Sequence, residues 1–153
     1  MYPDQKTILK SELESLRDRI IQNHIAAGQK ASGKTIQSLL VDVTEDQGEL
    51  TGRGFFAVLE TGRKGGKVPK GFQAIILKWA KDKGISIDNP KSFAFLVARK
   101  IAREGTLLHR TGGRTDIYSR EIPKTIENVL KRLGDDQVTE IINIFINAEK
   151  VMA

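Results

Sequence analysis

The chain has 153 residues, of which 39% are hydrophobic and 29% are charged, and its formal net charge is +6. This composition predicts one globular domain with its own core, and no apolar run is long enough to suggest a membrane span. Cysteine is absent, which excludes disulfides and thiolate metal sites, and the only histidines are His24 and His109. A His-rich metal cluster or a Ser-His-Asp triad therefore has little material. We expect no catalytic site, no metal site and no cofactor.

The charge is unevenly distributed along the chain. Residues 53–132 contain 18 Lys and Arg against 7 Asp and Glu, an excess of +11, whereas the flanks contain 7 against 12. A basic middle segment indicates an anionic partner, either nucleic acid or an acidic protein surface. Lysines on solvated helix faces would explain the same excess, because no aromatic residues alternate with the basic ones to form a base-stacking surface.

The first element is predicted to be a helix over residues 4–27. Its apolar residues recur at steps of three and four between charged ones, which is the pattern of an amphipathic helix. These residues are Leu9, Leu13, Leu16, Ile20 and Ile21.

Residues 28–35 read GQKASGKT and match the phosphate-binding pattern G-x-x-x-x-G-K-[ST]. That loop requires a strand before the first glycine and a helix after the Lys-Thr pair, so that backbone N–H groups converge on the phosphates. Here a helix is expected before the motif and the apolar run TIQSLLVDV, typical of a strand, follows it. The pattern therefore favours a polar connector over a nucleotide site.

A β-meander is predicted over residues 36–60. EDQG supplies a turn between its two apolar runs. In the second run, Phe55, Ala57 and Leu59 alternate with Phe56, Val58 and Glu60, which predicts a buried strand.

Two basic loops and a helical pair follow. Residues 61–71, TGRKGGKVPKG, predict an exposed and mobile loop, and residues 105–121 predict a second one. Between them, residues 72–104 predict two helices. Trp79 has the spacing of a core residue in the first, and Asn89 with Pro90 marks the start of the second.

The second of these helices is expected to bury four large apolar residues, Phe93, Leu96, Val97 and Ile101. Residues 123–148 predict a C-terminal helical region, although 138–147 also alternate as a strand would. The chain is therefore expected to be an α+β protein. A long N-terminal helix would pack on a small antiparallel sheet, followed by two to four further helices in a single domain of residues 1–153.

The order of these pieces resembles the neck and tail-completion proteins of tailed bacteriophages over roughly residues 5–132. The segments WAKDKGI and ARKIAREGTLLHRTGGRTDIYS are similar to versions found in phages of gut bacteria. The shared motifs are a small-Gly-basic-x-x-x-Ser strand entry and an aromatic strand that ends in Glu followed by Thr and Gly. The matching residues are Ser32, Gly33, Lys34 and Ser38, then Phe55, Phe56, Glu60, Thr61 and Gly62.

The resemblance implies a non-enzymatic virion component, assembled in the cytoplasm of the bacterial host. Such a head–tail connector or tail-completion protein would form a homo-oligomeric ring with other neck and tail proteins and without a membrane. Its basic residues would face packaged double-stranded DNA without sequence specificity, or would dock on acidic neighbours. The expected contact residues are Arg53, Arg63, Lys64, Lys67, Lys70, Arg110, Arg114 and Arg120. The alternative is a small basic nucleic-acid-binding domain that acts on its own.

Overall fold

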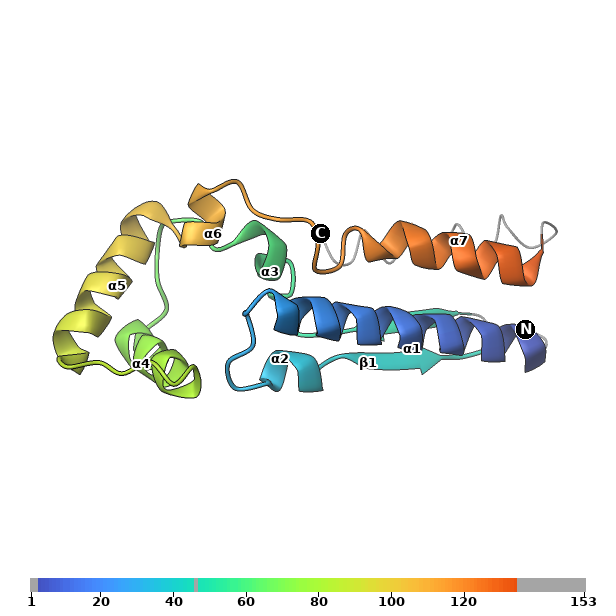
Figure 1. Ribbon diagram of the computed structural model, residues 1–153, viewed down its shortest axis with the longest axis horizontal. Helices are drawn as coiled ribbons and strands as arrows, with labels where there is room; N and C mark the ends of the chain where they lie inside the picture. The colour runs from blue at the N-terminus through green and yellow to red at the C-terminus, as the bar shows by residue number, and fades with distance from the viewer. Residues whose placement is uncertain (1–2, 46, 135–153) are drawn as a thin grey trace.

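The computed structural model describes residues 3–45 and 47–134 (Figure 1). A long N-terminal helix packs on a two-stranded antiparallel sheet, and further helices follow, so the predicted α+β class is confirmed. The elements in chain order are α1 (Pro3–Ala26), α2 (Lys34–Gln37), β1 (Leu40–Val43), β2 (Gly48–Thr51), α3 (Val58–Thr61), α4 (Phe72–Asp82), α5 (Pro90–Glu104), α6 (Leu107–Arg110) and α7 (Glu121–Leu133).

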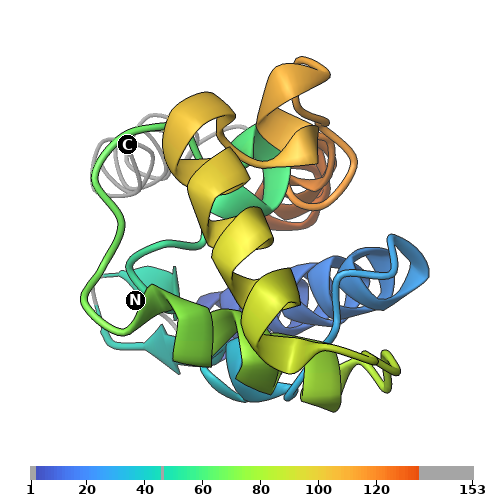
Figure 2. The ribbon, with the colours of Figure 1, turned by 90° about the vertical axis from the view of Figure 1, so that its left-hand side faces the viewer.

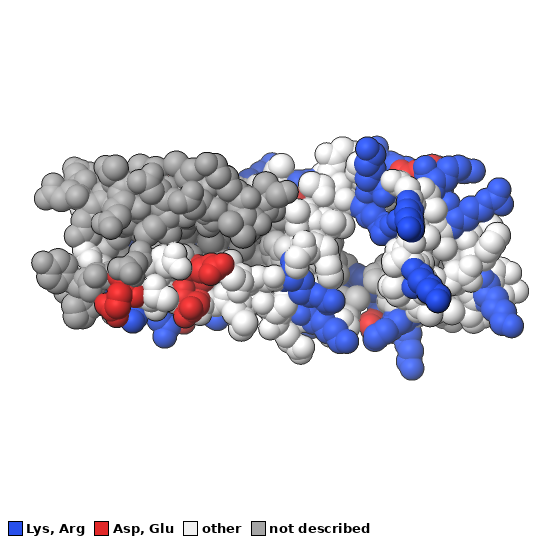
Figure 3. Space-filling view, turned by 180° about the vertical axis from the view of Figure 1, so that it is seen from behind, with Lys and Arg blue, Asp and Glu red and all other residues white. Residues whose placement is uncertain are grey.

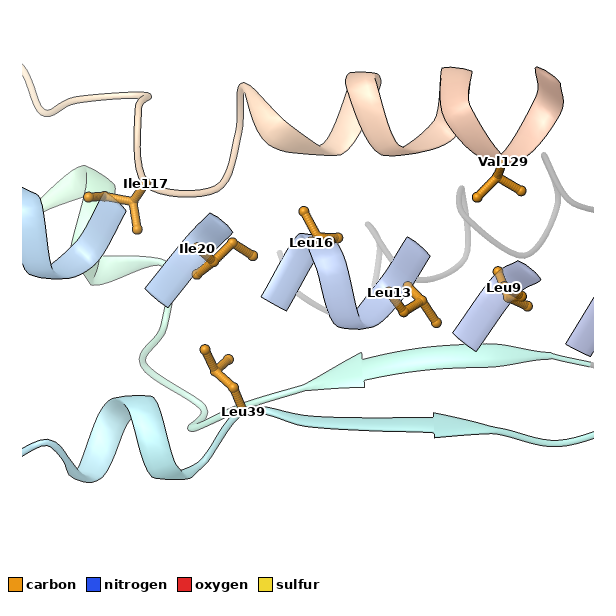
Figure 4. Packing of buried hydrophobic residues seen from close by; sticks show 7 residues of the cluster. All are labelled: Leu9, Leu13, Leu16, Ile20, Leu39, Ile117 and Val129. Carbon is orange, nitrogen blue, oxygen red and sulfur yellow. The ribbon is translucent and has the colours of Figure 1, made fainter. Parts of the chain in front are cut away.

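The core lies around α1, which runs between the β1–β2 hairpin and α7 (Figure 1). Figure 4 shows the side chains of its apolar stripe together with Leu39 from one side and Ile117 and Val129 from the other. Of the five predicted stripe residues, Leu9, Leu13, Leu16 and Ile20 are buried, and Ile21 packs against them while half-buried. The amphipathic prediction for this helix is therefore confirmed.

The hairpin has one face against α1 and one face in solvent. Val41, Val43 and Leu50 pack on the core, whereas the alternate positions of both strands are exposed. Gly48 lies so close to α1 that an added Cβ would be 2.7 Å from Cδ2 of Leu9. The pairing register places Asp42 directly opposite Glu49 on the exposed face.

Side-chain interactions join α1 to α7 at two places along the helix pair. Arg19 Nε lies 2.8 Å from Glu121 Oε2, and Arg19 Nη2 donates to Thr125 Oγ1 at 2.6 Å. Near the other end of the helix pair, Arg132 Nη1 lies 2.7 Å from Glu12 Oε1. Because Glu12, Glu121 and Thr125 are all buried, these contacts satisfy groups that would be costly to leave unpaired.

The predicted meander over residues 36–60 is too long at both ends. β1 begins at Leu40 and β2 ends at Thr51, and the segment predicted as the buried strand folds as turns followed by α3. Gly52 and Gly54 weaken strand pairing beyond Thr51. Phe56 and Leu59, three residues apart, then face the core together, whereas the side chain of Phe55 is half exposed. The spacing of three within this apolar run also fits one helical turn, and tertiary packing selects the turn.

The GQKASGKT motif is entered from α1, as predicted, but it leaves through the single helical turn α2 before β1 begins. Gly33, with φ of 81°, precedes that turn. The strand that a phosphate-binding loop needs before its first glycine is replaced by a helix, so the amide cradle has no scaffold here.

The helices α4 and α5 form a pair at the end of the molecule away from the N-terminus (Figures 1 and 2). Their contact is lined by small residues, since Ala80, Ala94 and Ala98 are buried there with Ile76. The cap of α5 is as predicted, with Asn89 Oδ1 accepting from Ser92 N at 3.1 Å.

The predicted core residues of this pair are partly wrong. Trp79 is 43% exposed and Leu96 is 61% exposed, because the close approach at alanine leaves these large side chains on the outside. Phe93, Val97 and Ile101 are half-buried. The C-terminal helical prediction is confirmed for α7, while the choice between helix and strand for 138–147 lies outside the described residues.

Candidate nucleic-acid interface

A buried carboxylate anchors the second basic loop. Glu60, at 3% exposure, accepts hydrogen bonds from the backbone N–H groups of Ile117, Tyr118 and Ser119 at 2.9, 2.7 and 3.0 Å. Its other oxygen accepts from the Ser119 hydroxyl. Three consecutive N–H groups pointing at one carboxylate form an anion-binding nest, and here the nest is filled by the chain itself. Residues 117–119 are therefore held against α3.

The first basic loop is tied to the second by backbone contacts. Arg63 N donates to Thr106 Oγ1, and Thr106 N donates to Arg63 O, both at 2.9 Å. Gly66 N donates to Ala102 O at 2.7 Å. At Gly62 an added Cβ would lie 2.3 Å from the backbone nitrogen of His109, so only glycine fits. The prediction of an exposed loop over 61–71 is wrong at Gly62, which is buried, and hydrogen bonds hold the backbone at Arg63 and Gly66.

Three predicted contact residues extend freely from this anchored loop. Lys64, Lys67 and Lys70 are exposed, and none of their side chains has an acidic partner within the described part of the chain. Arg53 and Arg120 are also exposed. The guanidinium of Arg53 lies 4.5 Å from the ring centroid of Phe55, which leaves its outer side open to a ligand.

Arg63 has a structural position instead. Its side chain is half-buried, its guanidinium lies 5.2 Å from the centroid of the Phe72 ring, and Nη2 donates to Lys67 O at 2.7 Å. Its Nε is buried without a hydrogen-bond partner among the described atoms. Arg63 therefore holds the loop in shape, and only part of its guanidinium faces outward.

Two other predicted arginines are engaged by carboxylates. Arg110 Nη1 lies 3.3 Å from Glu104, and Arg114 makes two hydrogen bonds to Asp116, at 2.6 and 2.9 Å. The hydrogen bonds from Arg114 lower the pKa of Asp116 to about 2, and the same contact raises the pKa of Arg114. The net charge that these pairs offer to an anion is small.

Sequence reasoning missed the basic residues on the helical pair. Residues 62–112 contain 12 Lys and Arg against 3 Asp and Glu, and on the face seen in Figure 3 basic side chains gather at this end of the molecule. The sequence signal is that basic residues recur at helical spacing along α5 and are exposed. Helix faces that contact only solvent show the same spacing. The missed residues are Lys78, Lys81, Lys91, Arg99, Lys100 and Arg103.

The structure therefore brings the two predicted loops together beside α4 and α5, at an end of the molecule that is rich in basic residues. Within residues 3–45 and 47–134, no group of three His, Asp or Glu side chains is placed to hold a metal ion. None of the helices in these ranges is long and apolar enough to cross a membrane. Comparison of the chain with protein-family models, with curated proteins and with solved structures gives no match.

Proposed function

We propose that this chain is a structural subunit of a tailed-phage virion, one of the proteins that form a ring at the neck or on the tail, with no enzymatic role. The proposal starts from the resemblance of its motifs to neck and tail-completion proteins. In this role its basic end faces packaged double-stranded DNA. The observation that carries this role is a set of exposed lysines on the anchored first loop, Lys64, Lys67 and Lys70, none of which has an acidic partner among the described residues.

These lysines suit a partner that moves past the protein. Phosphate contacts supply affinity without sequence information, and long lysine side chains adapt to a backbone whose position varies. The backbone of the loop that carries them is held at Arg63 and Gly66, so the three lysines keep their place on the surface. Their long side chains can still follow the phosphates. A subunit around a DNA path needs this combination.

The test is binding of duplex DNA of random sequence across a salt series. The variant Lys64→Glu/Lys67→Glu/Lys70→Glu is compared with Lys10→Glu/Lys30→Glu/Lys34→Glu, which makes the same charge change at exposed positions outside the basic end. The loop variant is expected to bind more weakly and to lose about 0.9 from the slope of log K against log salt for each phosphate contact removed. Equal losses in the two variants, or no binding by the parent chain at low salt, would contradict the proposal.

A second function is favoured by the same surface. A free-standing nucleic-acid-binding domain would use the exposed basic residues of 62–112, those on α5 included. That domain would hold DNA tightly as a single chain at physiological salt, whereas a ring subunit needs many weak contacts around one duplex. The affinity of the isolated chain near 150 mM salt, of the order of physiological ionic strength, separates the two functions.

A further inference from the structure

The outer face of α5 combines exposed apolar and cationic side chains. We define this face by Phe95, Leu96, Arg99 and Lys100, which lie at helical steps of three and four and are all exposed. Phe95 is 50% exposed and Leu96 is 61% exposed. Arg99 has no ion-pair partner among the described residues. Aromatic and arginine side chains together are typical of protein interfaces.

The outer face of the β1–β2 hairpin has the complementary composition. We define it by Leu40, Asp42, Glu49 and Thr51, the exposed positions of the two strands. Leu40 is 63% exposed, and Asp42 stands directly opposite Glu49. Two carboxylates at facing positions repel each other, and no described cation contacts either one, so the hairpin gains from a basic partner.

The two faces belong to different ends of one elongated chain. In Figure 1, α4 and α2 lie between α5 and β1, so the outer face of α5 does not reach the hairpin of its own chain. Figure 3 shows acidic side chains at the end away from α4 and α5, and mostly basic ones at the other. Two copies placed head to tail would bring an apolar and cationic face onto an apolar and acidic one.

We propose that the outer face of α5 binds the hairpin outer face of a second copy of this chain. The interface is heterologous, because different surfaces of the two copies meet, and repetition of such a contact gives a closed ring or an open filament. This inference rests on the proposed ring function and adds the surfaces that would build it. The lysines of the first loop take no part in this contact, since the loop lies to one side of α5 (Figure 2).

The test uses the absence of cysteine from the chain. Two single variants, Leu96→Cys and Leu40→Cys, place one thiol on each face at exposed positions. Mixing them under mild oxidation is expected to give a disulfide-linked heterodimer, and a chain carrying both changes is expected to give a ladder of covalent oligomers. The control is Ile25→Cys, at an exposed apolar position outside both faces. It is mixed in turn with Leu96→Cys and with Leu40→Cys, and each mixture is expected to give only background dimer.

Other results would overturn the interface. Cross-linking of Leu96→Cys with itself alone would show a symmetric contact between two α5 faces. Absence of any mixed disulfide over the background at high protein concentration would show that the faces do not meet. A loss of DNA affinity in Arg99→Glu as large as that of the three-lysine loop variant would show that DNA, and not a second copy, occupies the face.

Charge reversal tests the same interface independently, in chains that carry no added cysteine. Arg99→Glu and Asp42→Lys/Glu49→Lys are each expected to reduce self-association in sedimentation velocity, and the chain that combines them is expected to recover it. If the chain that combines these changes self-associates no better than the separate charge variants, the proposed pairing is wrong. If the interface fails while the loop lysines still bind DNA, the ring function survives with other surfaces. If the interface holds while virions lack the chain, the proposed function alone fails.

Discussion

Glu60 and Ser119 lie 59 residues apart, and the carboxylate of the first accepts both the backbone N–H of the second, at 3.0 Å, and its hydroxyl. The two N–H groups before Ser119 converge on the same carboxylate. This buried contact joins α3 to the start of the segment that leads into α7, and it therefore connects the basic end to the helical core.

Replacement of Glu60 by glutamine is expected to destabilise the protein by about 1.5–3 kcal/mol, the range for hydrogen bonds to a charged group. Glutamine has the same size, but its neutral carbonyl oxygen attracts three N–H groups less strongly, and its NH₂ group faces the Ser119 hydroxyl. Urea unfolding measures the change in the free energy of unfolding. The control Glu49→Gln alters an exposed carboxylate opposite Asp42 and is expected to be neutral or slightly stabilising. Equal stability of the Glu60→Gln and parent chains would contradict the anchoring role.

Gly62→Ala is expected to cost about 1–3 kcal/mol through overpacking. The added Cβ would meet the backbone nitrogen of His109 at 2.3 Å, and the φ of 69° disfavours any residue with a side chain. Gly54→Ala is the matched control, because no atom of the described residues lies within 4 Å of its added Cβ. A difference of less than about 0.5 kcal/mol between the two variants, the scatter of ordinary surface changes, would show that the two basic loops are not pressed together here.

The part of the fold that follows from local pattern was predictable. The stripe from Leu9 to Ile20 and the Asn89 cap each depend on residues a few positions apart, and both were confirmed. The class of the fold follows from these pieces. Helical bounds at α4 and α5 were also close to those predicted, because glycines terminate both helices.

The parts that failed depend on distant residues. The segment from Phe55 to Glu60 alternates like a strand, but it turns so that Glu60 can reach a nest of backbone amides 57 to 59 positions later. No sequence pattern near Glu60 indicates that these amides will converge on its carboxylate. Likewise, Trp79 and Leu96 have core spacing, and only the alanine contact between α4 and α5 leaves them outside. Arg114, one of the predicted contact residues, bonds to Asp116 only two positions away, so this pairing was predictable from the sequence.

The stability of the protein is expected to fall as the pH falls through about 6.5, the ordinary pKa of histidine. His24 is buried, and burial lowers its pKa, with the nearby charge of Lys83 adding to the effect against a hydrogen bond with Gln29. In this pH range the unfolded chain therefore binds a proton at His24 more readily than the folded chain does. The free energy of unfolding consequently rises with pH. Unfolding between pH 7.5 and 5.5, roughly one unit to either side of the histidine pKa, should show this slope. In His24→Gln the slope should flatten, and an unchanged slope in that variant would contradict the assignment.

Asp116→Asn is expected to increase affinity for duplex DNA. The change removes a carboxylate that holds Arg114 by two hydrogen bonds, so the guanidinium becomes free to contact phosphate. One new contact would steepen the salt dependence by about 0.9 in slope. The control Asp88→Asn removes the same charge at an exposed position within the basic end. Equal gains in the two variants would mean that net charge alone acts and that Arg114 makes no contact.

The number of copies of this polypeptide in purified phage particles decides whether the chain is a structural virion subunit. Quantitative mass spectrometry against the major capsid protein gives that number. A structural ring subunit predicts a fixed, stoichiometric multiplicity that withstands washing in salt. Absence from the particles, or a trace amount that varies between preparations, would contradict the account.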